Sequence, residues 1–256
     1  MMMALEAEGL TDVGLVRKHN EDSLFLDKDL GLFIVADGLG GHAAGEVASR
    51  IVVEQISKYI KQTAKPKFLA PLGLDNRLSL NGNRLKYAIQ VSDKAIIEDI
   101  MDHPERDTMG STVVACLVED NRVTLAHVGD SRAYLLNKNK IQQITMDHSW
   151  VAEQVELGLL TPEEAKRHPF RNVITQALGN GGGLEIDVQE FELTDYETAV
   201  MLCSDGLSGM VSDEQMLAIF NHAPDLRTVV NNLVSKAIEN GGEDNVTVVI
   251  VKNSLS

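Results

Sequence analysis

The sequence has little that would separate it from ordinary globular proteins. Its 256 residues contain no apolar run close to the roughly 20 residues that a membrane-spanning helix needs. The opening stretch MMMALEAEG has no basic residue and no long apolar core, so it does not resemble a signal peptide. The sequence therefore predicts a cytoplasmic protein without a membrane anchor.

Cysteine is almost absent. Cys116 and Cys203 lie in the apolar stretches VVACLV and AVMLCS, and neither belongs to a CxxC pair. This argues against a thiolate zinc site or a redox site. We expect two buried, unreactive thiols.

Positive charge is also scarce. Lys and Arg number 23 against 38 Asp and Glu, which gives a net charge of −15. No run of basic residues offsets this charge, so we expect no binding to nucleic acid or to an anionic membrane. The same charge repels phosphate-bearing ligands, so a phosphate site in this chain would need added cations.

Helix and strand patterns fill most of the chain. The expected order is an apolar strand at 32–36, helices over 43–62 and 85–100, a strand-rich middle over 111–145, a strand at 198–203, a helix starting at Ser212, an amphipathic helix over 226–238, and a buried strand at 245–251. Asp120-Asn121 predicts a hairpin turn. Because the middle strands do not alternate with helices, they should pair antiparallel. We therefore predict an α+β fold with sheets packed between helix layers.

Residues 147–180 form an insertion between strands. Ser149 to Leu157 should be helical, and Thr161 and Glu164 form a capping box for a second short helix. Residues 171–183 then read as a mobile surface segment. No linker divides the chain, so we predict a single domain over residues 1–256.

Four aspartates stand at the ends of apolar strands. Asp37 in FIVADGL and Asp205 in VMLCSDGL share one layout, Asp130 follows VTLAHVG, and Asp244 precedes the last strand. Asp-Gly pairs are common turn residues, so each one alone could be turn chemistry. The repetition at buried strand ends favours a converging site instead.

Converging carboxylates must either take up protons or bind cations. Carboxylate and carbonyl oxygens suit Mg²⁺ or Mn²⁺, whereas zinc or iron would call for several histidine ligands. The seven histidines are scattered and show no HExxH pairing. Sequence spacing alone does not show that the aspartates meet.

Six motifs occur in one order along the chain: GLVRKHNED, VADGLGGH, MGST, AHVGDSRAY, LCSDGL and GGEDNVTVV. Together they resemble the metal-dependent protein phosphatases of the protein phosphatase 2C (PPM) family, from Gly9 to Val251. The insertion is similar to that of compact bacterial members, particularly the cyanobacterial type that acts on the PII signalling protein. The resemblance makes the PII protein a candidate substrate.

This resemblance implies a four-layer α-β-β-α sandwich, with two central antiparallel sheets flanked by helices and residues 147–180 as a flap. It also implies two Mn²⁺ or Mg²⁺ ions in a core site, and a third ion that bacterial members can hold. Matched residue by residue, the implied ligands are Asp37, the Gly38 carbonyl, Asp205 and Asp244, with Glu21 contacting a metal-bound water and Asp130 serving the third ion.

The resemblance further implies hydrolysis of phosphoserine and phosphothreonine by direct attack of a metal-bridging hydroxide. Arg17 matches the arginine that binds phosphate, because a guanidinium holds two oxygens at once. His42 has three open roles: general acid, substrate contact or N-cap of the first helix. His168 in the flap is a candidate contact for phosphoprotein substrates, with a solvated helix-end histidine as its alternative.

We therefore expect a cytoplasmic, monomeric serine/threonine protein phosphatase that depends on Mn²⁺ or Mg²⁺. The alternative is a catalytically weak or silent regulatory member of the same fold. That alternative predicts a lost acid, and Asp37, Asp205 and Asp244 are all present.

Overall fold

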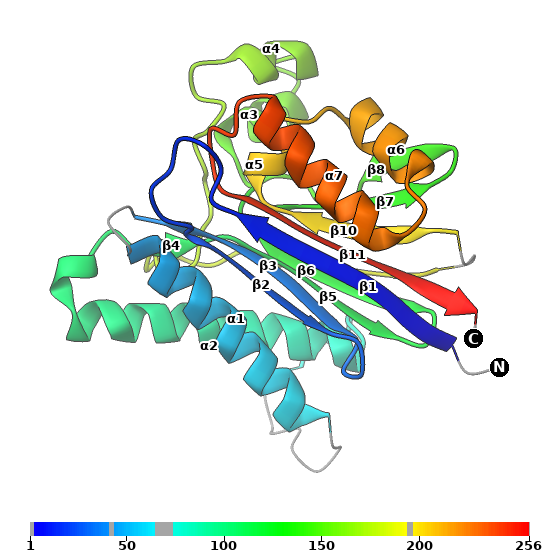
Figure 1. The fold of residues 1–256 in the computed structure, drawn as a ribbon. Coiled ribbons are helices and arrows are strands. Elements are labelled where there is room, and N and C mark those ends of the chain that lie inside the picture. The colour runs from blue at the N-terminus through cyan, green and yellow to red at the C-terminus, as the bar shows by residue number, and fades with distance from the viewer. Residues whose placement is uncertain (1–2, 41–43, 65–73, 194–196, 256) are drawn as a thin grey trace.

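Two β-sheets pack face to face in the computed structural model, which describes residues 3–40, 44–64, 74–193 and 197–255 (Figure 1). One sheet has the strand order β1 (Met3–Asp12), β11 (Val246–Leu255), β10 (Ala199–Cys203), β7 (Arg132–Asn137) and β8 (Lys140–Gln143). The other has the order β2 (Asp22–Asp27), β3 (Leu32–Leu39), β5 (Val113–Glu119), β6 (Arg122–Val128) and β9 (Asp187–Glu192), with β4 (Gly110–Ser111) paired to β3. Every one of these pairings is antiparallel, as the sequence predicted.

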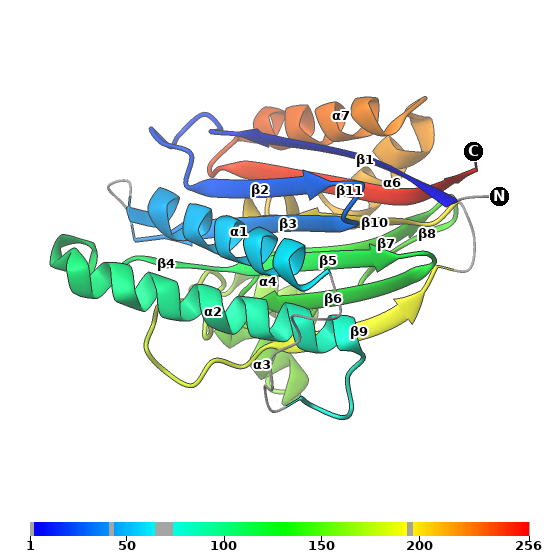
Figure 2. The same ribbon diagram turned by 90° about the horizontal axis from the view of Figure 1, so that it is seen from below.

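Helices cover the outer face of each sheet. The long helices α1 (Ala44–Thr63) and α2 (Leu80–Asp102) lie across the six-stranded sheet (Figure 2). On the five-stranded sheet lie α6 (Asp213–His222) and α7 (Leu226–Glu239) (Figure 1). The shorter elements are η2 (Pro104–Arg106), α3 (Trp150–Glu156), α4 (Pro162–Arg167) and α5 (Asp205–Ser208).

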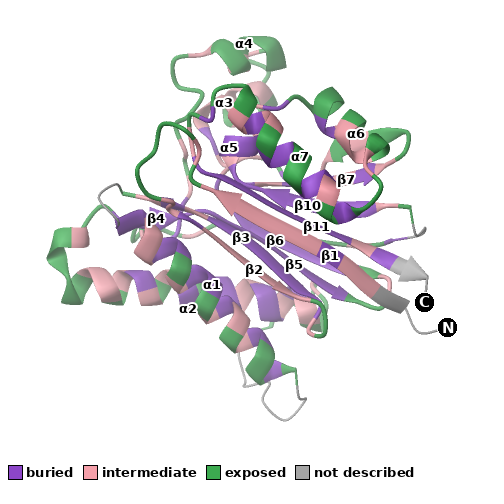
Figure 3. Ribbon diagram, in the orientation of Figure 1, coloured by how far each residue is buried: buried purple, intermediate pink, exposed green. Residues whose placement is uncertain are grey.

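The buried side chains form three apolar layers. One lies between α1, α2 and the six-stranded sheet, one between the two sheets, and one between α6, α7 and the five-stranded sheet. Figure 3 shows the central strands buried, β1 and β2 largely intermediate, and the outward faces of the helices exposed. This arrangement confirms the four-layer sandwich and the α+β class.

Several local predictions are confirmed. Thr161 and Glu164 form the capping box of α4, and Ser212 caps α6. Asp120 adopts a left-handed φ of 56° in the turn between β5 and β6. Cys116 and Cys203 are fully buried, and burial raises the pKa of each thiol to about 12, so both are unreactive at neutral pH.

Other local predictions are wrong. The first apolar strand, predicted to end at Ala36, continues to Leu39, because Gly38 and Leu39 pair with β4. Nor is the segment over 171–183 surface throughout. Leu178 is fully buried and exchanges two backbone hydrogen bonds with Ser111, of 2.9 and 3.1 Å.

No helix among the described residues is long and apolar enough to cross a membrane. This agrees with the absence of long apolar runs in the sequence.

Candidate functional site

The strand order brings the ends of several strands to one end of the sandwich. Because β3 and β6 are both antiparallel to β5, they run in the same direction and finish together. Asp37 lies near the end of β3, and Asp130 follows β6. In the other sheet, the end of β10 pairs with the start of β11, so Asp205 and Asp244 also lie at adjacent strand ends.

Asp22 joins the two sheets at this end. It is the first residue of β2 and pairs in register with Asp37. Its Oδ2 accepts hydrogen bonds from Ser204 Oγ at 2.7 Å and from Thr247 Oγ1 at 2.6 Å, and both of these residues belong to the five-stranded side. The two sheet edges therefore meet at a buried carboxylate.

The electrostatics show that the aspartates lie together. Burial, followed by the charges of four neighbouring aspartates, raises the pKa of Asp37 well above its usual value. Those neighbours are Asp22, Asp205, Asp130 and Asp244. We refer to these five residues as the acidic cluster.

Burial and neighbouring charge also act on the carboxyl groups of Asp22, Asp130 and Asp205. Burial, opposed by hydrogen bonds from Thr247 and Ser204, raises the pKa of Asp22 to about 7. Burial and the charge of Asp205 raise the pKa of Asp130 to about 7. Burial and the charge of Asp244 raise the pKa of Asp205. Without added cations, the acidic cluster is short of positive charge.

The donor set of the acidic cluster fits a hard divalent cation. Two buried oxygens, Asp22 Oδ1 and Asp130 Oδ1, have no hydrogen-bond partner among the described residues. Unpaired buried acceptors are costly, and a cation would satisfy them. Oxygen-only donors are those that Mg²⁺ and Mn²⁺ prefer.

Gly38 lies between the backbone of Gly45 and that of Glu21, with no room for a side chain. A Cβ at this position would lie 2.1 Å from the carbonyl oxygen of Gly45, at the start of α1, and 2.5 Å from that of Glu21. A Cβ on Gly45 would in turn lie 2.8 Å from the Gly38 carbonyl oxygen and 2.9 Å from Glu21 Cδ. The carboxylate of Glu21 and the carbonyl of Gly38 therefore lie close together beside Asp37.

Backbone contacts fix the position of Asp37. Its N–H donates to Thr112 Oγ1 at 3.2 Å, and its carbonyl oxygen accepts from the N–H of Thr112 at 2.9 Å and from Ser111 Oγ at 3.0 Å. These two residues belong to the MGST motif. The motif positions the acidic cluster.

Asn245 holds the N-terminal motif in place. Its Oδ1 accepts from the N–H of Glu21 at 2.8 Å, and its Nδ2 donates to the carbonyls of Val13 and His19 at 2.9 and 3.0 Å. The sequence motifs alone predict no role for Asn245 or for Asp22. Asn245 follows Asp244 and Asp22 follows Glu21, and this adjacency to predicted site residues was the signal in the sequence that could have indicated them.

Arg17 reaches the acidic cluster through Asp244. Its Nη2 lies 2.6 Å from Asp244 Oδ2, and half of its side chain is exposed. The guanidinium is therefore at the solvent side of the acidic cluster, where an incoming anion would meet it.

Both ends of the flap are attached next to the acidic cluster. At one end, the N–H of His148 donates to the carbonyl of Gly129, next to Asp130, at 2.9 Å. At the other end, Leu178 bonds to Ser111. Within the flap, the ring of His168 stacks on Trp150 with centroids 4.8 Å apart and contacts Phe170 edge-on at 5.5 Å.

The structure thus brings together most of the site residues predicted from the sequence: Asp37, Gly38, Asp205, Asp130, Asp244, Glu21 and Arg17. His168 lies in the aromatic cluster of the flap, with its Nδ1 accepting from the N–H of Phe170 at 3.2 Å. His42 lies outside the described residues.

Comparison with known proteins gives consistent matches over nearly the whole chain. A family model described as "Protein phosphatase 2C" matches residues 16–241. The chain is 38% identical to "Serine/threonine phosphatase stp" of Listeria welshimeri, over 98% of this chain and 97% of that protein. It is also 37% identical to "Serine/threonine protein phosphatase PstP" of Mycobacterium tuberculosis, over 97% of this chain and 45% of that longer protein.

Solved structures agree with these matches. The crystal structure of the Mycobacterium tuberculosis phosphatase PstP/Ppp superposes with a TM-score of 0.85 at 36% identity, covering 97% of this chain and 98% of that one. The catalytic domain of PstP "in complex with 2 Manganese ions" superposes with a TM-score of 0.84 at 35% identity, covering 99% and 100%.

Proposed function

The chain belongs to the protein phosphatase 2C family, and from this premise we propose that its acidic cluster is the metal-dependent centre at which it dephosphorylates phosphoserine and phosphothreonine in proteins. The observation that supports this most strongly is the meeting of five aspartates at one end of the sandwich. Two of them have buried oxygens with no hydrogen-bond partner among the residues that the structure describes. An acidic cluster of this kind is stable at neutral pH only with protons or cations bound.

Specific residues would hold the ions. Asp37, the Gly38 carbonyl, Asp205 and Asp244 are the proposed ligands of two ions, Mn²⁺ or Mg²⁺, with Glu21 acting through a water. Asp130 is the proposed ligand of a third. When bound, such ions supply a water of lowered pKa and neutralise charge on the phosphate oxygens.

The chain itself supplies orientation. Arg17, half exposed and paired with Asp244, can release this carboxylate and hold two oxygens of the substrate phosphate instead. The hydroxyl groups of Thr112 and Ser111 keep Asp37 in place through hydrogen bonds to its backbone. His42 keeps its three open roles as general acid, substrate contact and N-cap, and His168 is proposed to contact phosphoproteins from the flap.

The domain organisation, oligomeric state, location and substrate belong to the same proposal. Residues 1–256 form one catalytic domain with the flap at about 147–180, and the protein acts as a monomer in the cytoplasm. Its substrate is a phosphoprotein. The PII signalling protein is a candidate on the resemblance of the insertion alone.

Turnover of a phosphothreonine peptide and of p-nitrophenyl phosphate tests the proposed activity. We expect hydrolysis with Mn²⁺, loss of hydrolysis in EDTA, and loss in Asp205→Ala but not in Asp29→Ala, an exposed aspartate in the turn between β2 and β3. Turnover that persists in EDTA and in Asp205→Ala contradicts the metal-dependent centre. Absence of turnover in any metal ion, with a folded protein, favours the silent regulatory alternative.

A further inference from the structure

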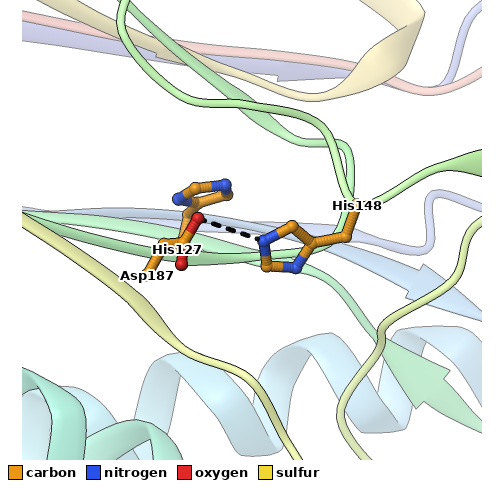
Figure 4. A group of neighbouring side chains, drawn as sticks. All are labelled: His127, His148 and Asp187. Atoms are coloured by element: carbon orange, nitrogen blue, oxygen red, sulfur yellow. Dashed lines mark hydrogen bonds and ion pairs between the residues drawn. The ribbon is translucent and has the colours of Figure 1, made fainter. Parts of the chain in front are cut away.

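A second group of ligand side chains lies outside the acidic cluster. His127 at the end of β6, His148 at the start of the flap and Asp187 at the start of β9 point toward one another (Figure 4). One ligand atom from each lies within 4.8 Å of the others. The two histidines are 21 residues apart in sequence and show no motif spacing, which is why the sequence did not reveal them.

His127 is prepared to act as a ligand. Its Nε2 lies 2.8 Å from the carbonyl oxygen of Met146, and since a carbonyl only accepts, Nε2 carries the ring proton. This leaves the Nδ1 lone pair free of the proton. Burial lowers the pKa of His127, so the ring is neutral at physiological pH. A ligand histidine whose second nitrogen donates to a backbone carbonyl is the usual arrangement in metal sites.

His148 and Asp187 already have the separation that a shared ion requires. His148 Nε2 lies 3.4 Å from Asp187 Oδ2. Two ligand atoms at about 2.0 Å from a tetrahedral zinc ion are about 3.3 Å apart. The Asp187 side chain is 47% exposed and the His148 side chain 10%, so an ion can reach the group from solvent on the Asp187 side.

We propose that His127, His148 and Asp187 form a binding site for Zn²⁺, distinct from the acidic cluster, with water completing the coordination. Two imidazoles and one carboxylate suit zinc, whereas the acidic cluster offers only oxygen and suits Mg²⁺ or Mn²⁺. The two sites thus separate two classes of ion by ligand chemistry. The zinc site goes beyond the proposed function and does not depend on it, and only its effect on activity rests on the proposed function.

Zinc at this site would also affect the acidic cluster. His148 Nδ1 accepts a hydrogen bond of 3.3 Å from the N–H of Gly129, which precedes Asp130. Zinc on Nε2 requires the single ring proton to sit on Nδ1, so the N–H of Gly129 loses its acceptor. The turn that carries Asp130 is then held less firmly, and bound zinc is expected to lower phosphatase activity.

Cobalt provides a spectroscopic test of the site. Co²⁺ is added to metal-free protein in excess Mg²⁺, which occupies the acidic cluster. We expect the strong visible absorption of four-coordinate Co²⁺, removed by one equivalent of Zn²⁺. The absorption should be lost in His127→Asn and in Asp187→Asn, with zinc affinity reduced at least tenfold, and kept in Asp205→Asn and in His103→Ala, an exposed histidine outside the group.

The outcomes separate the two metal sites. Absorption that survives in Asp187→Asn, a surface change that leaves the core intact, overturns the proposal. So does absorption lost in Asp205→Asn, because the cobalt would then sit in the acidic cluster.

For the effect on activity, each variant is compared with its own zinc-free rate. If the same zinc concentration inhibits Asp187→Asn and the unaltered protein equally, zinc does not act on activity through the hydrogen bond between Gly129 and His148.

Discussion

At the residue scale, Asp22 is the least expected member of the site. It is 7% exposed and accepts two hydrogen bonds on Oδ2, whereas Oδ1 has no partner in the described part of the chain. The sequence motif predicts a role for its neighbour Glu21 but none for Asp22. The reason is physical: only the folded sheets show that Asp22 pairs in register with Asp37 and bonds across to Ser204 and Thr247.

The raised pKa of Asp22 predicts how stability depends on pH. Burial lifts this pKa from an ordinary 3.8 to about 7, so the folded protein binds the proton more tightly than the unfolded chain. The resulting stabilisation is complete below about pH 4 and lost as pH rises toward 7. In EDTA, we expect the melting temperature to fall by roughly 5 °C or more between pH 5 and pH 8. Added Mn²⁺ should restore most of the lost melting temperature at pH 8.

Asp22→Asn isolates this contribution. The amide oxygen can still accept from Ser204 and Thr247, but the side chain carries no charge. We expect the variant to lose less stability than the unaltered protein over the same pH range in EDTA, as measured by calorimetry. An identical decline in both proteins would show that Asp22 does not contribute.

Arg17 supplies a second prediction at this scale. Arg17→Ala should lower kcat/KM for a phosphothreonine peptide by about 10- to 100-fold, which corresponds to about 1.4–2.7 kcal/mol of lost transition-state binding. Arg17→Lys should not recover it, because an ammonium group cannot hold two oxygens in one plane. Arg50→Ala, on the exposed face of α1, serves as the control. Full recovery by lysine would rule out bidentate binding.

At the element scale, helix patterns were the most predictable feature. The amphipathic pattern over 226–238 matches α7, and the caps Thr161 and Ser212 act as the sequence predicted. Strands without a strong apolar run were missed: β1, β2 and β9 are partly exposed along much of their length. The glycine-rich surroundings of Leu178 predict a surface segment, because local sequence does not show its pairing with the distant Ser111.

Packing of α7 gives a direct stability prediction. Leu233 is fully buried between α7 and the five-stranded sheet. Leu233→Ala should destabilise the protein by about 3 kcal/mol, through lost burial and the cavity left behind. Asn232→Ala, on the exposed face of the same helix, should change stability by less than about 0.5 kcal/mol. Equal effects in urea unfolding would mean that α7 is not packed as described.

The flap is expected to act on protein substrates rather than on the chemistry. His168 stacks on Trp150 at the flap surface, and both ends of the flap are attached beside the acidic cluster. His168→Ala should therefore lower activity on a phosphoprotein several-fold and leave p-nitrophenyl phosphate turnover unchanged. Lys166→Ala, an exposed change in α4, is the matched control. Unchanged activity on the phosphoprotein would remove His168 from the site.

At the scale of the whole molecule, the site exists because two sheets finish at the same edge. Each of Asp37, Asp130, Asp205 and Asp244 could be identified in the sequence as an acid at a strand end. Their meeting depends on the strand order of both sheets, which local periodicity does not encode. Family resemblance suggested that meeting, and the antiparallel pairings account for it. The group of His127, His148 and Asp187 had no such support and became visible only in the folded chain.

The central claim is that the acidic cluster is the catalytic metal centre. Equilibrium Mn²⁺ binding, followed through the electron paramagnetic resonance signal of the free ion, tests it most directly. It should be measured beside peptide turnover on the same samples of the unaltered protein, Asp37→Asn and Asp29→Asn. We predict that the unaltered protein and Asp29→Asn bind at least two Mn²⁺ per chain and hydrolyse the peptide. Asp37→Asn should lose both properties together. If Asp37→Asn binds Mn²⁺ as tightly as the unaltered protein and retains turnover, the acidic cluster is not the catalytic metal centre.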